Sequence, residues 1–247
     1  ASALWLLHRL QGKLPPELIE SVLQNADHQV VEQLLRIEPE TLRTEKRVFS
    51  LLEQLAATEN GALKFRLALL AGTVTDPAAS LNILSELARN ADRDPWLQQA
   101  ILIAAHEQPA EILAGLFDDL ADNHSSARQE LIQKLAEQIG LRNKAAEIAV
   151  ALNLLGETGP LASANSLSDQ DQYLIRLALL RGLGNGLRLK GQLLTTHVAQ
   201  APEAVQMAVG KTCTTATAIA RETSQTNGLR LPALDLLRFT RDPNVLE

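Results

Sequence analysis

The residues best suited to metal binding or to catalysis are five histidines, and they are scattered along the chain. Two histidines on one helix bind zinc when three residues separate them, as in His-x-x-x-His or His-Glu-x-x-His. No pair in this chain has that spacing. We therefore predict that none is catalytic or a metal ligand, and that most lie at helix ends or on the surface. The five are His8, His28, His106, His124 and His197.

Cys213 is the only cysteine, so the chain has no internal disulfide and no cysteine-based metal site. A reactive thiol needs a nearby cation or the N-terminus of a helix. Lys211 is two residues away and would face another side of the expected helix. We predict that Cys213 is a small buried residue without a chemical role.

Acidic residues come together at Asp92-Arg93-Asp94, at Asp118-Asp119, and at Asp169 with Asp171. A calcium loop would need further oxygen ligands and a glycine at fixed spacing, and these are missing. Carboxylates near the N-terminus of a helix stabilise it through the helix dipole. We interpret these acids as helix caps and solvated residues, and we expect a helix to begin near Asp169.

The glycine-rich run Gly182-Leu183-Gly184-Asn185-Gly186 matches neither a P-loop nor a dinucleotide-binding fingerprint. It follows an expected helix instead of a strand, so we predict that it stops that helix and forms a turn. The sequence therefore offers no catalytic, cofactor-binding or metal-binding residue, and it does not identify a binding residue.

A segmental repeat is the strongest signal in the chain. Residues 63–72 (LKFRLALLAG) return at 173–182 (YLIRLALLRG), and the order Arg, Leu, Ala, Leu, Leu, Gly is kept. A self-match at this distance indicates a repeated helical unit. Arg66 and Arg176 are equivalent in the two copies. One reading is a ladder of cations for an acidic partner. We favour a structural role, either a salt bridge between repeats or a hydrogen bond to the C-terminal carbonyls of a helix, with the alkyl stem packed on the next repeat.

Composition predicts an all-α fold. Hydrophobic residues make up 46% of the chain and aromatic residues 3%, so Leu and Ala carry most of the apolar content. The two tryptophans, Trp5 and Trp96, are expected in the core. The net charge is −6 with both signs interspersed, which argues against a nucleic-acid interface and a polybasic membrane-surface site. No apolar run is long enough to span a bilayer.

Helix start signals recur along the chain, among them Pro15-Pro16, Asp76-Pro77, Asp94-Pro95, Pro109 and Pro202. They predict about fourteen helices, or six or seven hairpins of about 35–40 residues, which is the size of HEAT and armadillo repeats. We predict a single right-handed α-solenoid over residues 1–247, with a possible loop insertion at 156–168. A globular helical bundle is the alternative fold.

Several helix boundaries are predicted from local signals alone. A capping box at Ser126 and Gln129 should start a helix that ends at Gly140. A further helix should cover residues 187–199, and Pro232 should open the last one. The chain begins without Met and ends soon after Asp242-Pro243, which looks like the start of another helix. We therefore expect an excised fragment of a larger multidomain protein.

Four segments resemble the HEAT-repeat region of large haem-binding proteins assigned as membrane-bound dehydrogenases in planctomycetes and their relatives. They are residues 3–7 (ALWLL), 12–18 (GKLPPEL), 64–69 (KFRLAL) and 94–102 (DPWLQQAIL). The similarity covers about residues 1–120 well and the rest loosely, and its motifs are helix-packing patterns of moderate specificity. The chain departs from the family at Gln98, where a basic residue is usual, and at residues 28–37, which lack the Asp-Pro start.

The resemblance implies that the repeats connect a β-propeller-like domain to a cytochrome c domain. It also implies a periplasmic or membrane-associated parent protein in which haem c is bound elsewhere, because one cysteine cannot form Cys-x-x-Cys-His.

Three functions remain open. The first is a non-catalytic scaffold that docks proteins or neighbouring domains, without nucleic acid and without membrane insertion. The second is the structural part of a haem-dependent dehydrogenase. The third is a helical-repeat DNA glycosylase of the alkylpurine kind, which requires a cationic concave face.

Overall fold

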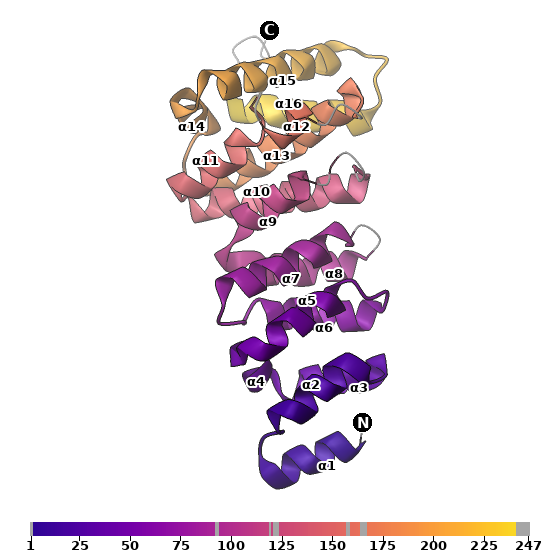
Figure 1. Cartoon of the computed structure of the whole chain (residues 1–247). Helices are drawn as coiled ribbons and strands as arrows, with labels where there is room; N and C mark the ends of the chain where they lie inside the picture. Colours follow the sequence, from indigo (N-terminus) through magenta and orange to yellow (C-terminus); the bar gives the residue numbers. More distant parts are fainter. Residues whose placement is uncertain are drawn as a thin grey trace. The chain divides into compact units, whose positions relative to one another are not determined.

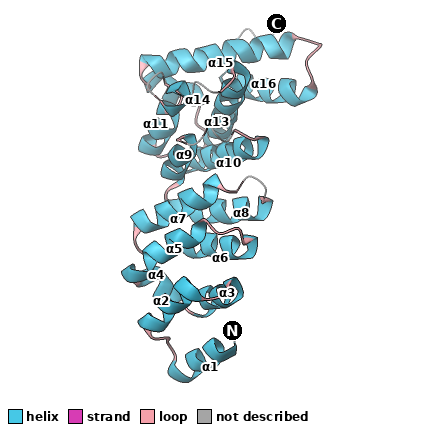
Figure 2. Cartoon of the chain, turned by 45° about the vertical axis from the view of Figure 1, so that its right-hand side comes forward, coloured by secondary structure: helices cyan, strands magenta, loops and turns pink. Residues whose placement is uncertain are grey.

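The computed structural model describes residues 2–91, 94–118, 120, 124–156, 159–163 and 167–240. In these residues the secondary structure consists of helices joined by loops and turns, with no strand (Figure 2). None of the described helices is both long enough and apolar enough to cross a bilayer. The chain forms two compact units, Ala1–Gln108 and Pro109–Glu247. Each unit is built of helices packed against their neighbours, as composition predicts.

The first unit contains a series of short helices (Figure 1). They are α1 (Ser2–Gln11), α2 (Pro16–Asn25), α3 (His28–Ile37), α4 (Pro39–Thr44), α5 (Phe49–Ala56), α6 (Gly61–Ala71), α7 (Pro77–Arg89) and α8 (Pro95–Ala104), with 3-10 turns at Lys46–Val48 and Ala105–Glu107.

Within this unit the helices pack as hairpins in two rows. The hairpins are α2 with α3, α5 with α6, and α7 with α8. In one row α2 contacts α5 and α5 contacts α7, while in the other α3 contacts α6 and α6 contacts α8. Each hairpin therefore buries its apolar side against the hairpins before and after it. Leu34, Leu52, Leu67 and Ile101 are fully buried in this way.

Asp-Pro pairs start α7 and α8, as the sequence predicts. The Asp76 carboxylate accepts hydrogen bonds from the backbone N–H groups of Ala78 and Ala79, and Asp94 accepts from those of Trp96 and Leu97. The proline that follows each aspartate occupies the first helical position, where its missing N–H costs nothing. The carboxylate and the proline together fix where each helix begins.

The second unit contains longer helices. They are α9 (Pro109–Phe117), α10 (Ser126–Arg142), α11 (Ala145–Asn153), α12 (Pro160–Ser163), α13 (Asp169–Leu189), α14 (Leu194–Gln200), α15 (Glu203–Arg221) and α16 (Asn227–Thr240). Here too there are two rows: α9 contacts α11 and α11 contacts α14, while α10 contacts α13 and α13 contacts α16. The central helix is α13, which also packs against α14 and α15.

The predicted stop at residues 182–186 is wrong, because α13 runs through this run without interruption. The glycines serve close packing. A Cβ atom on Gly182 would lie 2.1 Å from the carbonyl oxygen of Gln133, and one on Gly186 would lie 2.2 Å from that of Glu137, both on α10. A Cβ on Gly140 of α10 would meet the α13 backbone at 2.7 Å. Only glycine allows two helix backbones to approach this closely.

Gly72 and Gly182, the last residues of the two repeated stretches, share a packing role. A Cβ on Gly72 would lie 2.7 Å from Cα of Ala104 on α8, so Gly72 also sits at a close helix contact. Gly72 ends α6 with a right-handed backbone, φ −63°, whereas its equivalent Gly182 lies inside α13. In both copies the glycine lies where its helix approaches a neighbour in the same row, α8 for Gly72 and α10 for Gly182, and it ends the helix in only one copy.

Two predicted boundaries of α10 are wrong. Ser125, not Ser126, is the N-cap, and its side chain accepts a hydrogen bond from the N–H of Arg128. The helix passes Gly140, which packs against α13, and ends at Asn143 in the left-handed conformation, φ 51°. Asn tolerates that conformation better than other residues with a Cβ.

The boundaries expected for residues 187–199 and for Pro232 are also wrong. A turn with Gly191 at φ 70° separates α13 from α14, so there is no single helix there. The last helix begins at Asn227 and carries Pro232 in its interior. The expected loop at 156–168 contains the short helix α12, and residues 157–158 and 164–166 lie outside the described part.

We predict opposite effects for the same substitution at two helical glycines. Gly186→Ala should lower the free energy of unfolding by about 2 kcal/mol or more, because the methyl group cannot fit against the α10 backbone. Gly210→Ala should raise it by about 0.5–1 kcal/mol, because Gly210 lies inside α15 with nothing within 4 Å of its Cβ position. Urea unfolding followed by circular dichroism measures both. Equal effects at the two sites would contradict the close-packing role.

Candidate functional site

Arg66 forms a salt bridge between successive hairpins, which is one of the two structural roles that the sequence predicts for it. It lies on α6, and its Nε donates to Oε1 of Glu32 on α3, 2.6 Å away. Both side chains are partly buried, with 32% and 24% of their surface exposed. Since α3 and α6 belong to successive hairpins, the pair clamps neighbouring repeats together.

Arg176 does not form the equivalent bridge, and the expectation for this residue is wrong. Its Nη2 donates to Oε1 of Gln172, one turn earlier on α13, at 3.3 Å. Among the described residues its buried Nε atom has no hydrogen-bond partner and its guanidinium has no ion pair. Helix α15 contributes Lys211 to the hollows that Arg176 lines.

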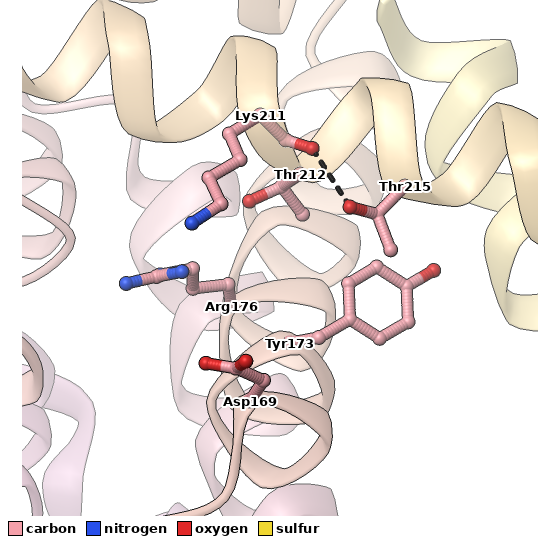
Figure 3. Close-up of a pocket in the computed structure, with 6 residues that line it drawn as sticks. All are labelled: Asp169, Tyr173, Arg176, Lys211, Thr212 and Thr215. Carbon is pink, nitrogen blue, oxygen red and sulfur yellow. Dashed lines mark hydrogen bonds between the residues drawn. The ribbon is translucent and has the colours of Figure 1, made fainter.

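A cleft between α13 and α15 surrounds Arg176. It has two adjoining hollows, of about 230 and 270 Å³, that share Arg176 and Lys211; we refer to both together as the Arg176–Lys211 cleft. The first is lined by polar residues: Asp169, Tyr173, Thr212 and Thr215 (Figure 3). The second is lined mainly by apolar residues: Leu155, Gly156, Ala204, Met207 and Ala208.

Helix α15 carries Lys211 and stays helical although this helix is rich in threonine, a residue of low helix propensity. The hydroxyl of Thr212 donates to the carbonyl of Ala208 at 2.8 Å, and that of Thr215 donates to the carbonyl of Lys211 at 3.0 Å. These bonds to the preceding turn occupy the hydroxyl hydrogens. Figure 3 shows the Lys211 ammonium extending towards the Arg176 guanidinium, on the side of the cleft away from the Tyr173 hydroxyl.

The electrostatics of the cleft are set by two cations and one acid. Burial lowers the pKa of Arg176 below its ordinary value, and the nearby Asp169 carboxylate opposes this change. No ion pair to Lys211 is present among the described residues. Two positive groups that share one hollow with a single acid leave an excess of one positive charge, and this favours an anion.

Tyr173 borders the cleft and is 7% exposed. Its hydroxyl is buried and finds no hydrogen-bond partner in the described part of the chain. Burial raises the pKa of Tyr173 to about 12, and the neighbouring Cys213 adds to the effect. The hydroxyl therefore stays protonated at neutral pH and does not serve as a base.

The histidines lie apart from one another. His8 approaches Glu38 at 3.6 Å, His28 contacts Thr58 at 3.4 Å, and His124 approaches Asp171 at 3.8 Å. His106 lies beside its neighbour Glu107, and His197 on α14 lines a hollow of about 240 Å³ against α11. In the described residues no three His, Cys, Asp or Glu side chains gather into a group that could hold a metal ion.

The acid pairs act mainly at helix ends. Asp94 caps α8, and α13 begins at Asp169 as predicted. Its cap is Ser168, whose hydroxyl donates to Asp171 while accepting from the Asp171 N–H. Asp92, Arg93 and Asp119 lie outside the described residues.

The tryptophans and the cysteine differ from expectation. Trp96 is 75% exposed and Trp5 is 46% exposed, so the prediction that both lie in the core is wrong. Trp5 donates a hydrogen bond to Gln33 at 3.2 Å. Cys213 is half-buried and not fully buried. The prediction for Trp96 relied on its hydrophobicity alone. In the structure, α8 directs Leu97 and Ile101 to the core and leaves Trp96 exposed.

Glu38 is a buried polar residue that sequence reasoning missed. It is 3% exposed, and its carboxylate accepts hydrogen bonds from the Leu14 N–H at 2.6 Å and from the Thr41 hydroxyl at 2.8 Å. It thereby joins the α1–α2 connection to the start of α4. The Glu-Pro pair at residues 38–39 resembles the Asp-Pro starts and was the only signal available.

Comparison of the chain with protein-family models, curated proteins and solved structures found no match.

We predict different outcomes for the two equivalent arginines. Arg66→Met should lower the free energy of unfolding by about 1 kcal/mol, because it leaves Glu32 partly buried without its partner. Arg176→Met should leave stability unchanged or raise it, because it removes an unpaired and partly buried cation. Urea unfolding can follow the first unit by tryptophan fluorescence and the second by Tyr173 absorbance. A larger loss for Arg176→Met would show that this residue is also a clamp.

We predict that Tyr173, the only tyrosine, ionises near pH 12 in the native chain and near pH 10 in urea. Since its pKa is raised on folding, the associated stability is intact below pH 10 and is lost as pH rises towards 12. Absorbance at 295 nm measures the titration, and Tyr173→Phe is the control that should abolish the signal. A native midpoint near 10 would mean that the ring is solvated.

Proposed function

We propose that the chain is a non-catalytic helical-repeat scaffold, a right-handed α-solenoid of the HEAT or armadillo kind. It would dock a protein partner or a neighbouring domain of the same chain. The two-row packing within each unit supports this proposal, since hairpins that bury only their flanks leave the outer faces of both rows free for binding. The echo of residues 63–72 at 173–182 supports it at the level of sequence.

The observation that carries the docking role is the apolar outer surface of α8. Trp96 and Ile103 are 75% and 65% exposed, and they are seven residues apart, so they lie on the same side of the helix. On the neighbouring α6, Leu69 is 40% exposed. Tryptophan is enriched among the residues that dominate binding energy in protein interfaces. We call these three residues the α6–α8 surface.

The redox-linked role implied by the family resemblance stays a prediction. The part of the chain that the structure describes contains no observation that favours it over docking alone. The same holds for a DNA glycosylase.

We predict that Trp96→Ser combined with Ile103→Ser reduces recovery of specific partners at least tenfold without unfolding the chain. Burial of a tryptophan and an isoleucine contributes several kcal/mol to an interface, and both side chains contribute little to the core. Affinity capture from the source cells with quantitative mass spectrometry measures recovery, and circular dichroism checks the fold.

The matched control is Leu189→Ser combined with Leu231→Ser, which removes two residues that are 58% and 61% exposed in the second unit. Partners lost equally in the control and the test variant would reflect general stickiness. Partners retained by the test variant would show that the α6–α8 surface does not dock them.

A further inference from the structure

The Arg176–Lys211 cleft has the features of a ligand site that the docking role does not explain. Its two cations come from different helices, α13 and α15, and neither forms an ion pair among the described residues, although the Asp169 carboxylate lies near Arg176. Arg176 is half-buried and Lys211 is exposed, and bringing these two like charges to one hollow costs free energy. The arrangement becomes favourable when an anion lies between the two groups, and Figure 3 shows both pointing to the same side.

The hydrogen bonds around the cleft restrict what kind of group can bind. The hydroxyl hydrogens of Thr212 and Thr215 are donated to α15 carbonyls, and the Tyr173 hydroxyl points away from the cations. Arg176 and Lys211 are therefore the side chains able to donate to a ligand in the polar hollow. A group that only accepts hydrogen bonds fits this arrangement best.

The charge balance favours a monoanion. Arg176 and Lys211 contribute two positive charges and Asp169 contributes one negative charge, so a single negative charge neutralises the cleft. A carboxylate meets this condition, whereas a phosphate dianion would leave an excess of negative charge next to Asp169. Burial already lowers the pKa of Arg176, and a bound carboxylate would restore it towards its ordinary value.

The second hollow has room for an apolar group attached to the carboxylate. Leu155, Ala204, Met207 and Ala208 supply its apolar wall, and methionine adapts to ligands of different shape. Hollows of about 230 and 270 Å³ lie just below the range of about 300–1,000 Å³ that is usual for ligand pockets. The size therefore limits the ligand to a short chain.

We propose that the Arg176–Lys211 cleft binds a carboxylate that carries a short apolar chain. Arg176 and Lys211 hold the carboxylate, and the wall formed by Leu155 and Met207 covers the chain. The carboxylate belongs to a free monocarboxylic acid or to the C-terminal residue of a peptide, which share this chemistry. This inference does not depend on the α6–α8 surface.

The test uses the full chain and sodium hexanoate, with acetate, hexanol and inorganic phosphate at matched ionic strength as comparisons. Calorimetric titration should show saturable hexanoate binding with a Kd on the order of 1 mM, as expected for a ligand with few heavy atoms. Acetate should bind at least threefold more weakly, because it lacks the apolar chain. Hexanol should not bind, because it lacks the charge.

Two variants and one control locate the site. Arg176→Met and Lys211→Met should each weaken hexanoate binding at least tenfold, and Lys211→Met keeps the test valid if Arg176→Met misfolds. Lys190→Met removes the same charge from an exposed position at the end of α13 and should leave binding unchanged. Equal losses in all three would reduce the effect to net charge and would overturn the proposal.

A peptide that ends in Ala-Leu with a free carboxylate distinguishes the two sources, and its C-terminal amide is the control. Binding of the free-acid peptide at least tenfold tighter than hexanoate, lost in both variants, assigns the cleft to a peptide carboxylate. Hexanoate binding as tight as that of the peptide assigns it to a free acid. The proposal is overturned if phosphate binds more tightly than hexanoate, or if neither probe saturates at concentrations about tenfold above 1 mM.

Discussion

The contact on which the second unit depends is the close approach of the α10 and α13 backbones. Gly140, Gly182 and Gly186 remove the Cβ atoms that would keep the two helices apart, and Gly182 and Gly186 are four residues apart on one face of α13. The approach places α13 at the centre of the unit, where it also meets α14, α15 and α16. The N-terminal half of the same helix carries Tyr173 and Arg176. The geometry of the candidate ligand cleft therefore depends on a packing contact about two to four turns away along α13.

The two copies of the repeated stretch show how equivalent residues acquire different roles. Arg66 meets Glu32 because the neighbouring helix α3 presents an acid at that position. Arg176 instead shares a hollow with Lys211 of α15, a helix outside the row formed by α10, α13 and α16. The ten-residue stretch that carries the arginine is similar in the two helices, and the residues around it decide whether the arginine forms a salt bridge within the fold.

Burial and exposure separate the structural polar residues from the candidate binding residues. Glu38 is buried, and its two hydrogen bonds account for its cost of desolvation, so it belongs to the fold. Arg176 is partly buried and not fully bonded, and Trp96 exposes a large apolar surface at no evident benefit to stability. Groups that the fold leaves unsatisfied are the natural candidates for contact with other molecules.

By itself the sequence determined the helical class and the Asp-Pro starts at Asp76 and Asp94, because these follow from local propensity and capping. The repeated pattern predicted a structural role for Arg66 but did not identify Glu32 as its partner. Tertiary structure decided the rest. The glycines at 182–186 read as a turn signal, yet packing against α10 stabilises a continuous helix by more than glycine disfavours it. Cleft formation by Arg176 and Lys211 could not be predicted, since the two residues are far apart in sequence and neither belongs to a known motif. Which face of α8 points outward was likewise set by the neighbouring helices, because a helix with apolar residues on several sides has no single inner face in its sequence.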